Sequence, residues 1–251
     1  MLKDIKTKKS RDESGLFFVE GERFIAEIPE EYEICYYVIS RNFADTHDLS
    51  VYKKRAKCEV VRDSIFKSIA DTVTPQGVMA VCEKKIYSLE NILQANGFIL
   101  LCENLRDPGN IGTLVRTASA AGAGGAIFSN GSCEVYSPKV LRSAAGAVLR
   151  LPIISDIQTE ETLVAIKKEK TKIFAAHPRG NDLPYNLNMK EKFCLLIGNE
   201  SHGISKEAQM HADATVRLPM TNETESLNAS VAGSILMYEA VRQRMDSHVI
   251  V

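Results

Sequence analysis

Five short apolar runs recur along the second half of the chain, and stretches with helical spacing separate most of them. The runs are residues 98–101, 126–128, 172–176, 193–197 and 215–218. Strands that alternate with helices are typical of a mainly parallel sheet covered on both faces, because a parallel connection has to cross over the sheet. The pattern therefore predicts an α/β domain over residues 97–251.

A smaller α/β unit is expected ahead of this domain. Residues 32–39 are rich in β-branched and aromatic side chains, and residues 16–19, 58–61 and 77–82 are further candidate strands. Helical stretches at 21–27 and 63–70 lie between these runs. Residues 85–96 are polar at both ends and are typical of a linker with a short helix. We therefore expect a first domain over residues 1–84.

Composition limits the class of protein more than it reveals the activity. The 251 residues are 45% hydrophobic, which is enough for two cores, and the formal net charge is −1, so any nucleic-acid contact has to come from local basic patches. The six cysteines are dispersed without a C-x-x-C pair, which favours free thiols in a reducing compartment, and no metal-ligand cluster is visible. No apolar run approaches the roughly 18 residues of a membrane span. We expect a cytoplasmic protein without a membrane partner or a metal.

The first polar cluster follows the strand at 98–101. Residues 107–110 (Asp-Pro-Gly-Asn) form a turn sequence, and Asn110 can cap a helix that begins at Ile111. Arg116 lies six positions beyond Asn110, so it stays near the carboxyl edge of the sheet, where ligands bind in open α/β folds. Taken alone, this segment is better explained as a capped helix with a surface arginine.

Two further clusters follow later strands. Gly198 and Glu200 end the run at 193–197, where a glycine lets a ligand approach the backbone and the carboxylate can orient Arg116. Ser226 is a possible helix N-cap, and Asn228 can present its amide to a ligand. Because the carboxyl ends of parallel strands meet at one edge, we expect Asn110, Arg116, Glu200, Ser226 and Asn228 to converge.

In this order, the three clusters resemble the three signature motifs of the SpoU (TrmH) family of RNA ribose 2′-O-methyltransferases. The resemblance implies that the second domain is an α/β trefoil-knot (SPOUT) methyltransferase domain with a mainly parallel sheet, which is an exception to unknotted topology. It implies that S-adenosylmethionine binds in the knot. The cofactor positions that it carries over are Gly198, Leu218, Met220, Leu227 and Asn228.

The family's arginine matches Arg116 and is associated with activation of the ribose 2′-hydroxyl. An ordinary arginine is a poor base because its pKa exceeds about 12, so Arg116 acts either through a substrate phosphate or in a strongly perturbed environment. The resemblance implies that Asn110, Glu200, Ser226 and Asn228 orient the arginine, the ribose and the cofactor. It also implies that no metal takes part.

The first domain resembles the L30e-like substrate-binding domain of rRNA-modifying members. The matching residues are 10–11, 15–21 and 75–78. Candidate RNA contacts are Arg11 in this domain and Lys139 and Arg142 in the second domain. The presence of this domain favours large-subunit rRNA over tRNA as the substrate, with a tRNA methyltransferase as the runner-up.

A long apolar stripe marks the C-terminal helix. It comprises Leu227, Val231, Ile235, Tyr238 and Val241, at steps of three and four residues. Such a stripe packs in a core or in a subunit interface. The resemblance favours a homodimer whose interface includes this helix and the first helix of the knotted domain.

Two other functions are compatible with parts of the sequence. A dinucleotide-binding oxidoreductase is suggested by the glycines at 122–125, but they follow a helix and precede a strand, which is the reverse of the required order. A non-catalytic RNA-binding or ribosome-assembly protein on the same fold is the second alternative. Retention of all five candidate polar residues argues against it.

Overall fold

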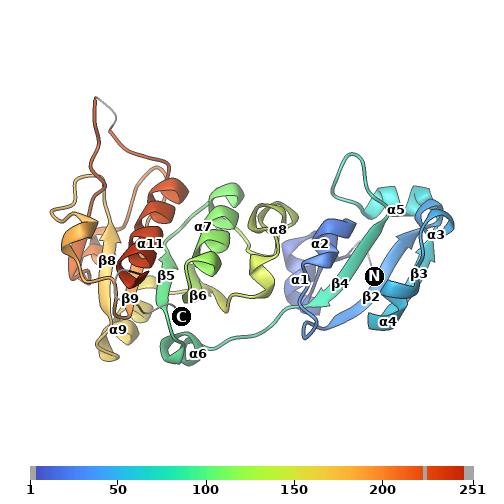
Figure 1. The fold of residues 1–251 in the computed structure, drawn as a ribbon, viewed down its shortest axis with the longest axis horizontal. Coiled ribbons are helices and arrows are strands. Elements are labelled where there is room, and N and C mark those ends of the chain that lie inside the picture. Colours follow the sequence, from blue (N-terminus) through green and yellow to red (C-terminus); the bar gives the residue numbers. More distant parts are fainter. Residues whose placement is uncertain (1–3, 223–224, 246–251) are drawn as a thin grey trace.

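The N-terminal part of the chain forms a four-stranded sheet. The structure is a computed structural model that describes residues 4–222 and 225–245. The strand order is β1 (Leu16–Glu20), β4 (Val78–Glu83), β2 (Ile34–Ser40) and β3 (Lys57–Val61), and only the β2–β3 pair is parallel. Around this sheet lie η1 (Asp4–Lys6), α1 (Lys8–Ser14), α2 (Glu22–Ala26), α3 (Arg41–Thr46), α4 (Ser50–Arg55) and α5 (Asp63–Ile69) (Figure 1). The predicted small α/β unit is confirmed.

The C-terminal part forms a six-stranded sheet in which every strand pair is parallel. The order is β10 (Ala214–Val216), β8 (Lys172–Ala176), β9 (Phe193–Ile197), β5 (Phe98–Cys102), β6 (Ala123–Ser129) and β7 (Ile153–Ile157). The five predicted strands are confirmed. The edge strand β7 was not predicted, because its middle residues are polar and exposed and so lack the apolar run of a central strand.

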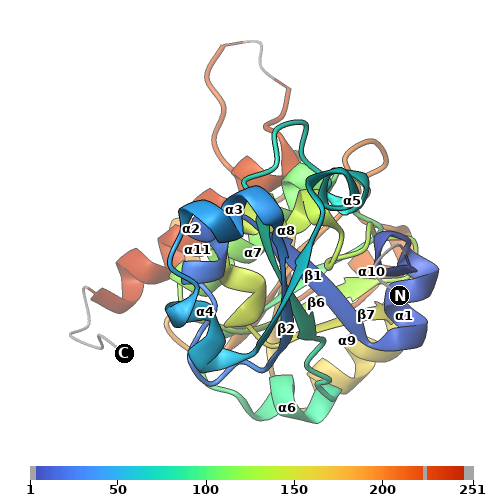
Figure 2. The ribbon, with the colours of Figure 1, turned by 90° about the vertical axis from the view of Figure 1, so that its right-hand side faces the viewer.

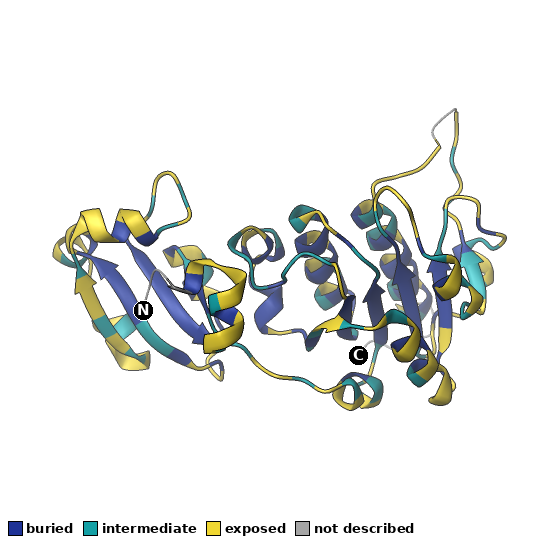
Figure 3. Ribbon diagram, turned by 180° about the vertical axis from the view of Figure 1, so that it is seen from behind, coloured by how far each residue is buried: buried dark blue, intermediate teal, exposed yellow. Residues whose placement is uncertain are grey.

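Helices cover both faces of this sheet. One face packs against α7 (Pro108–Ala120), α8 (Pro138–Ala144) and α11 (Ala229–Met245), and the other against α6 (Leu89–Gln94), α9 (Thr159–Lys168) and α10 (Lys206–Met210). The central strands β5 and β9 are buried along their whole length (Figure 3). Two short turns, η2 (Ala147–Leu149) and η3 (Pro184–Asn186), complete the domain. No helix in the described part of the chain is long and apolar enough to cross a membrane.

The segment predicted as a linker is only partly a linker. An extended stretch leaves β4, but α6 then docks on the C-terminal sheet (Figure 1). Ile92 of α6 is fully buried, and its side chain fills the space above Gly125, where an added Cβ would lie 2.8 Å from Ile92 Cγ1. The helix therefore belongs structurally to the C-terminal domain.

The two domains pack against each other along β1 and α8. Phe17 of β1 is fully buried, and its ring lies 4.8 Å from that of Tyr136, which precedes α8. Arg11 is 4% exposed and forms a bidentate pair with Glu134, with a 2.7 Å bond from Nε to Oε1. This buried pair and the aromatic contact hold the domains in one arrangement.

Candidate active site

The polar loops of the C-terminal domain gather at the carboxyl edge of its sheet. They follow β5, β8, β9 and β10, and β5 and β9 are direct neighbours in the sheet. Figure 2 shows residues 217–222, which follow β10, on the same side of the molecule as the loop between α5 and β4. Ligand sites in open parallel sheets form at this edge.

Glu200, after β9, is bound to the start of α7. Its Oε1 accepts hydrogen bonds from the Asn110 side-chain amide at 3.0 Å and from the Asp107 backbone N–H at 3.2 Å. Its Oε2 accepts from the Arg106 backbone N–H at 3.4 Å. The predicted convergence of Glu200 and Asn110 is observed, and it joins the first cluster to the second.

These hydrogen bonds set the ionisation of Glu200. Desolvation is the largest single contribution and raises the pKa, but hydrogen bonds from Asn110 and from the backbone N–H groups of Glu200, Asp107 and Arg106 outweigh it. The net result is a pKa below the ordinary value for glutamate. Glu200 is therefore a carboxylate acceptor at neutral pH and is unsuited to donate a proton.

The helix start in the first cluster differs from the prediction. Asn110 is not the N-cap of α7, because the helix begins at Pro108 and Asp107 caps it by accepting from the Asn110 backbone N–H at 2.8 Å. Proline suits the first helical position, where its missing N–H costs no hydrogen bond. Capping by Asp107 leaves the Asn110 side chain free to turn toward Glu200.

The third cluster also differs in its cap. Asn228, and not Ser226, caps α11, since its Oδ1 accepts from the backbone N–H groups of Ser230 at 2.8 Å and Val231 at 3.3 Å. Ser226 lies exposed in the preceding loop. Asn222 in that loop has a φ of +60°, a left-handed conformation that asparagine adopts more readily than most residues.

Ser230 joins the third cluster to the first and was not predicted. It is 5% exposed, and its hydroxyl lies 3.1 Å from Asn110 Oδ1 and 2.7 Å from Asn228 Oδ1. Because Glu200 accepts from the Asn110 amide nitrogen, the Asn110 oxygen faces Ser230 and needs a donor. Glu200, Asn110, Ser230 and Asn228 form one continuous network. The sequence signal was a serine two residues after a capping asparagine, which local capping alone explains.

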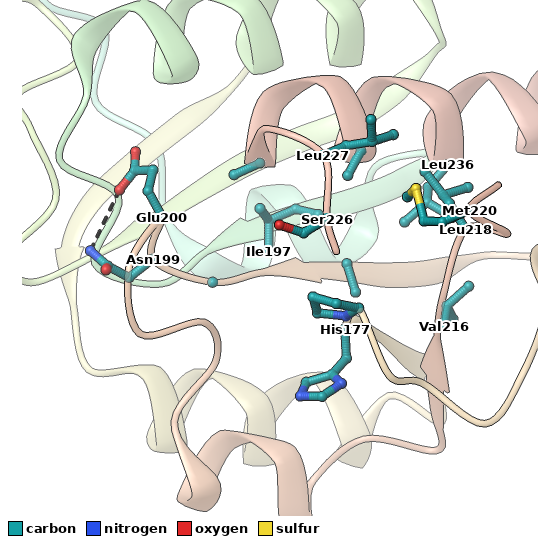
Figure 4. Close-up of a pocket in the computed structure, with 15 residues that line it drawn as sticks. His177, Ile197, Asn199, Glu200, Val216, Leu218, Met220, Ser226, Leu227 and Leu236 are labelled. Carbon is teal, nitrogen blue, oxygen red and sulfur yellow. Dashed lines mark hydrogen bonds between the residues drawn. The ribbon is translucent and has the colours of Figure 1, made fainter. Parts of the chain in front are cut away.

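A cavity of ≈ 130 Å³ lies beside this network (Figure 4). Four of the expected cofactor positions line it, and Ser226 also reaches its rim. The four are Gly198, Leu218, Met220 and Leu227. Asn228 does not line the cavity and instead caps the helix beside it. The walls are largely apolar, through Ile197 and Leu236, and the polar rim includes Asn199 and Glu200.

The loop after β9 owes its shape to Gly198. A Cβ on this residue would lie 2.3 Å from the backbone of Gly203 and Ile204, because the loop folds back on itself. Glu103, at the end of β5, holds the far end of the loop by accepting from the N–H and the hydroxyl of Ser205, both at 2.8 Å. Gly198 is therefore required by the chain itself as well as by any ligand in the cavity.

His177 and Pro178 line the same cavity from the loop after β8 and were not predicted. The backbone N–H of Arg179 donates to His177 Nδ1 at 3.0 Å, so that nitrogen is an acceptor. Figure 4 shows the imidazole on the side of the cavity opposite α11. The strand at 172–176 was predicted. The loop that follows its carboxyl end could therefore have been predicted to join the other three loops at this edge.

Arg116 does not join the network. Six helical residues place it about 9 Å further along α7 than Asn110. Within residues 4–222 and 225–245, the side chain of Glu200 binds Asn110 and the backbone of Arg106 and Asp107 and not Arg116, so a role of Glu200 in orienting Arg116 stays a prediction. Arg116 is exposed and opens into a cleft of ≈ 730 Å³ between the two domains.

The three expected RNA contacts have different surroundings. Arg11 is buried in its pair with Glu134, so no face of its guanidinium is open to a phosphate, and its assignment to RNA is corrected to a domain contact. Arg142 is exposed and pairs with Asp71 of the N-terminal domain at 2.5 Å. Lys139 is exposed on α8.

Comparison with known proteins assigns the two parts of the chain separately. Residues 97–238 match the SpoU rRNA Methylase family. The chain belongs to this family. Residues 1–80 match the MRM3-like substrate binding domain. The trefoil knot of the family stays a prediction for this SpoU methylase, because strand order and pairing do not fix how the chain is threaded.

Relatives span nearly the whole of this SpoU methylase. It is 30% identical over 237 residues to the 23S rRNA (guanosine(2553)-2′-O)-methyltransferase RlmP of Bacillus subtilis, covering 94% of this chain and 92% of that protein. It is 26% identical to the mitochondrial rRNA methyltransferase 3 of Mus musculus, over 95% of this chain and 70% of that protein. The crystal structure of the SpoU methyltransferase AviRb of Streptomyces viridochromogenes, in complex with AdoMet, superposes with a TM-score of 0.84 at 27% identity, covering 97% of this chain and 96% of that one.

Proposed function

We propose that this chain transfers the methyl group of S-adenosylmethionine to a ribose 2′-hydroxyl of large-subunit ribosomal RNA. The observation that carries the proposal is the hydrogen-bonded network that joins all three signature loops beside one cavity. Family membership supports methyl transfer, and the names of the relatives support ribose 2′-O-methylation of rRNA. The substrate-binding domain at residues 1–80 supports rRNA as the class of RNA.

The cavity has the chemistry that S-adenosylmethionine requires. Leu218, Met220 and Leu236 give it apolar walls for the adenosyl group, and the backbone of the loop at Gly198 lies open beside them. Glu200 supplies a negative charge at the rim of the cavity, and this charge favours the positively charged sulfonium of the cofactor. When bound, the cofactor supplies an electrophilic methyl group for in-line transfer to oxygen.

The residues of the chain then contribute positioning and charge. The Asn110–Ser230–Asn228 network holds the start of α7 and the start of α11 in a fixed relation, which orients a ribose above the cavity. Arg116 holds a phosphate next to the target ribose and stabilises the negative charge that develops on the 2′-oxygen. As the methyl–oxygen bond forms and the methyl–sulfur bond breaks, the proton of the 2′-hydroxyl passes to that phosphate or to water, so the guanidinium itself transfers no proton.

We further propose that the enzyme is a homodimer. The apolar stripe of α11 lies on its exposed face, with Val231 45%, Ile235 44% and Tyr238 54% exposed. The opposite face of the helix packs on the sheet through Leu236, Met237 and Ala240. Such a surface calls for a partner, and a second copy is the partner that the family resemblance implies.

Each of the two sheets belongs to one of the two proposed functional domains. We propose an L30e-like RNA-binding domain over residues 1–84 and a methyltransferase domain over 97–251, with α6 of the connecting segment packed on the latter. We propose the cytoplasm as the place of action, in line with the rRNA substrate named for the bacterial relative.

The test is methyl transfer from tritiated S-adenosylmethionine to unmodified rRNA and tRNA, followed by alkaline hydrolysis. We expect label in alkali-resistant dinucleotides of 23S rRNA. Arg116→Ala should lose at least about 100-fold in transfer, because charge stabilisation is lost, while cofactor binding by calorimetry stays within a factor of about 3. Lys168→Ala, on the opposite face of the sheet, is the control.

Two results would contradict the proposal. Turnover by Arg116→Ala at the wild-type rate would remove this residue from the mechanism. Label that appears in alkali-sensitive mononucleotides would mean base methylation instead of ribose methylation.

A further inference from the structure

The cleft between the two domains is lined by arginines from both sides. Arg23 comes from α2 of the N-terminal domain, and Arg116, Arg142 and Arg150 come from the methyltransferase domain. All four side chains are exposed, and the cleft measures ≈ 730 Å³. A concentration of guanidinium groups in a protein of net charge −1 marks this cleft as a site for an anion.

Two carboxylates line the cleft, Glu20 and Glu27, and Arg142 pairs with Asp71. Glu27 is the lining carboxylate that pairs with one of the cleft arginines. Glu27 Oε2 accepts from Arg150 at 2.9 Å, and the same arginine donates to the Glu27 backbone oxygen at 3.0 Å. The hydrogen bond and the charge of Arg150 hold the pKa of Glu27 below its ordinary value, and the charges of Arg23 and Arg116 add to the effect. Arg150 therefore holds this carboxylate directly, in a cleft that Arg23 and Arg116 also line.

The pair between Glu27 and Arg150 contributes little to holding the domains together. Both side chains are 47% exposed, and water and salt screen such exposed pairs. The pair of Arg11 and Glu134 differs, with side-chain exposures of only 4% and 11%. That buried pair fixes the domain contact, whereas the Glu27 pair can break at small cost.

A carboxylate and a phosphodiester present similar targets to a guanidinium. Each offers two oxygens that accept parallel hydrogen bonds, and arginine binds both in this way. Glu27 thus occupies, among these arginines, the position that suits an RNA phosphate. Arg116 belongs to the same group, so a phosphate held here lies next to the residue to which we assign the charge stabilisation.

We propose that Glu27 is an internal stand-in for a phosphate of the substrate RNA. In the free protein its carboxylate holds Arg150 and places a negative charge in the cleft that Arg23 and Arg116 also line. When an RNA strand enters the cleft, a phosphodiester group displaces the carboxylate and takes over these guanidinium groups. Glu27 therefore competes with RNA. The inference rests on the proposed function, because it assigns this cleft to the RNA of that reaction.

The experiment measures binding of an in vitro transcribed, unmodified 23S rRNA by filter retention at fixed salt. Loss of the Glu27 charge should tighten RNA binding. We expect Glu27→Gln to lower the Kd for RNA by about 2- to 5-fold, which is the effect expected from removing one exposed ion pair. Arg150→Ala should weaken binding. Glu27→Gln should gain little in the Arg150→Ala background, because the competing pair is already broken.

Glu31→Gln is the matched control. Glu31 lies four residues further along the same domain, is exposed and does not line the cleft, so its substitution removes the same charge elsewhere. An unchanged or raised Kd for Glu27→Gln would overturn the inference. An equal gain for Glu31→Gln would also overturn it, because general charge repulsion would then account for the effect.

Methyl transfer by the wild type, measured in parallel, separates this inference from the proposed function. Tighter binding by Glu27→Gln without any transfer by the wild type would leave the phosphate site standing and remove the reaction. Transfer by the wild type with no change in binding by Glu27→Gln would do the reverse.

Discussion

At the residue scale, Ser230 has one hydroxyl hydrogen and two acceptors within reach. Asn228 Oδ1 already accepts from two backbone N–H groups, whereas Asn110 Oδ1 has Ser230 as its donor in the network. The Ser230 hydroxyl therefore donates to Asn110 Oδ1. This bond orients the Asn110 side-chain amide, whose nitrogen donates to Glu200. Ser230 is a positioning residue, because it acts through Asn110.

We expect Ser230→Ala to lower kcat by about 10-fold or more and to change the Kd of S-adenosylmethionine by less than about 3-fold, since the cavity walls are untouched. The unsatisfied Asn110 oxygen should also lower the free energy of unfolding by about 1–3 kcal/mol. Transfer kinetics, calorimetric binding and urea unfolding give the three values.

Ser234→Ala is the matched control for this change. The Ser234 hydroxyl lies one helical turn further along α11 and 3.0 Å from Thr117 Oγ1, so it also joins α11 to α7, without touching Asn110. A fall in kcat of equal size in both variants would show that helix packing is responsible and would remove the positioning role.

The ionisation of Glu200 makes the free energy of unfolding depend on pH. Its folded pKa lies below the ordinary value of 4.5, so the stability from its ionised form is fully present above the unfolded pKa and is lost as the pH falls through the folded pKa. We expect wild type to exceed Glu200→Gln in free energy of unfolding by a constant amount above about pH 5.5, and the difference to shrink below about pH 4.5.

Urea unfolding across this pH range measures the difference, with Glu31→Gln as the exposed control. A difference that vanished between pH 6 and 7 would mean a raised pKa for Glu200, and the carboxylate role given to it here would be wrong.

At the element scale, two helix starts show where local sequence rules have more than one solution. Asp107 and Asn110 are both good N-caps, and Pro108 decides between them because proline suits the first helical position. Ser226 and Asn228 are likewise both good caps, and the hydrogen bonds of Asn228 with Ser230 select the later one. In both cases the predicted functional residue is near its predicted place, but its structural role is different.

The exposed apolar face of α11 predicts that the protein forms a dimer. We expect the wild type to be a dimer at micromolar concentration by light scattering, because this face would otherwise stay in water. Ile235→Glu should shift the protein to a monomer, since a buried unpaired charge would cost several kcal/mol in an interface.

Val164→Glu is the control for this change. Val164 is 41% exposed on α9, which covers the opposite face of the sheet. A monomeric wild type would contradict the interface, and so would equal dissociation in both variants.

At the scale of the whole molecule, the arrangement of two domains gives each arginine its role. Arg11 was assigned to RNA because it is basic and lies near other basic residues, but it is buried against Glu134. Arg116 was expected beside Glu200, but the structure places it in the interdomain cleft. Charge in a sequence does not reveal which carboxylate of a distant segment will face it. Arg116 lines the cleft between the domains, so both domains border the place where we propose that RNA binds.

The sequence by itself determined the two α/β units, five of the six strands of the larger sheet and the loops that carry the signature residues. These follow from local apolar runs and turn residues, which a linear pattern records. Only the tertiary structure decided that Ser230 joins two of the loops, that His177 lines the cavity and that Glu27 pairs with Arg150 in the interdomain cleft. Each of these depends on contacts between segments far apart in the chain, and such contacts form only when the sheet and the two domains are packed.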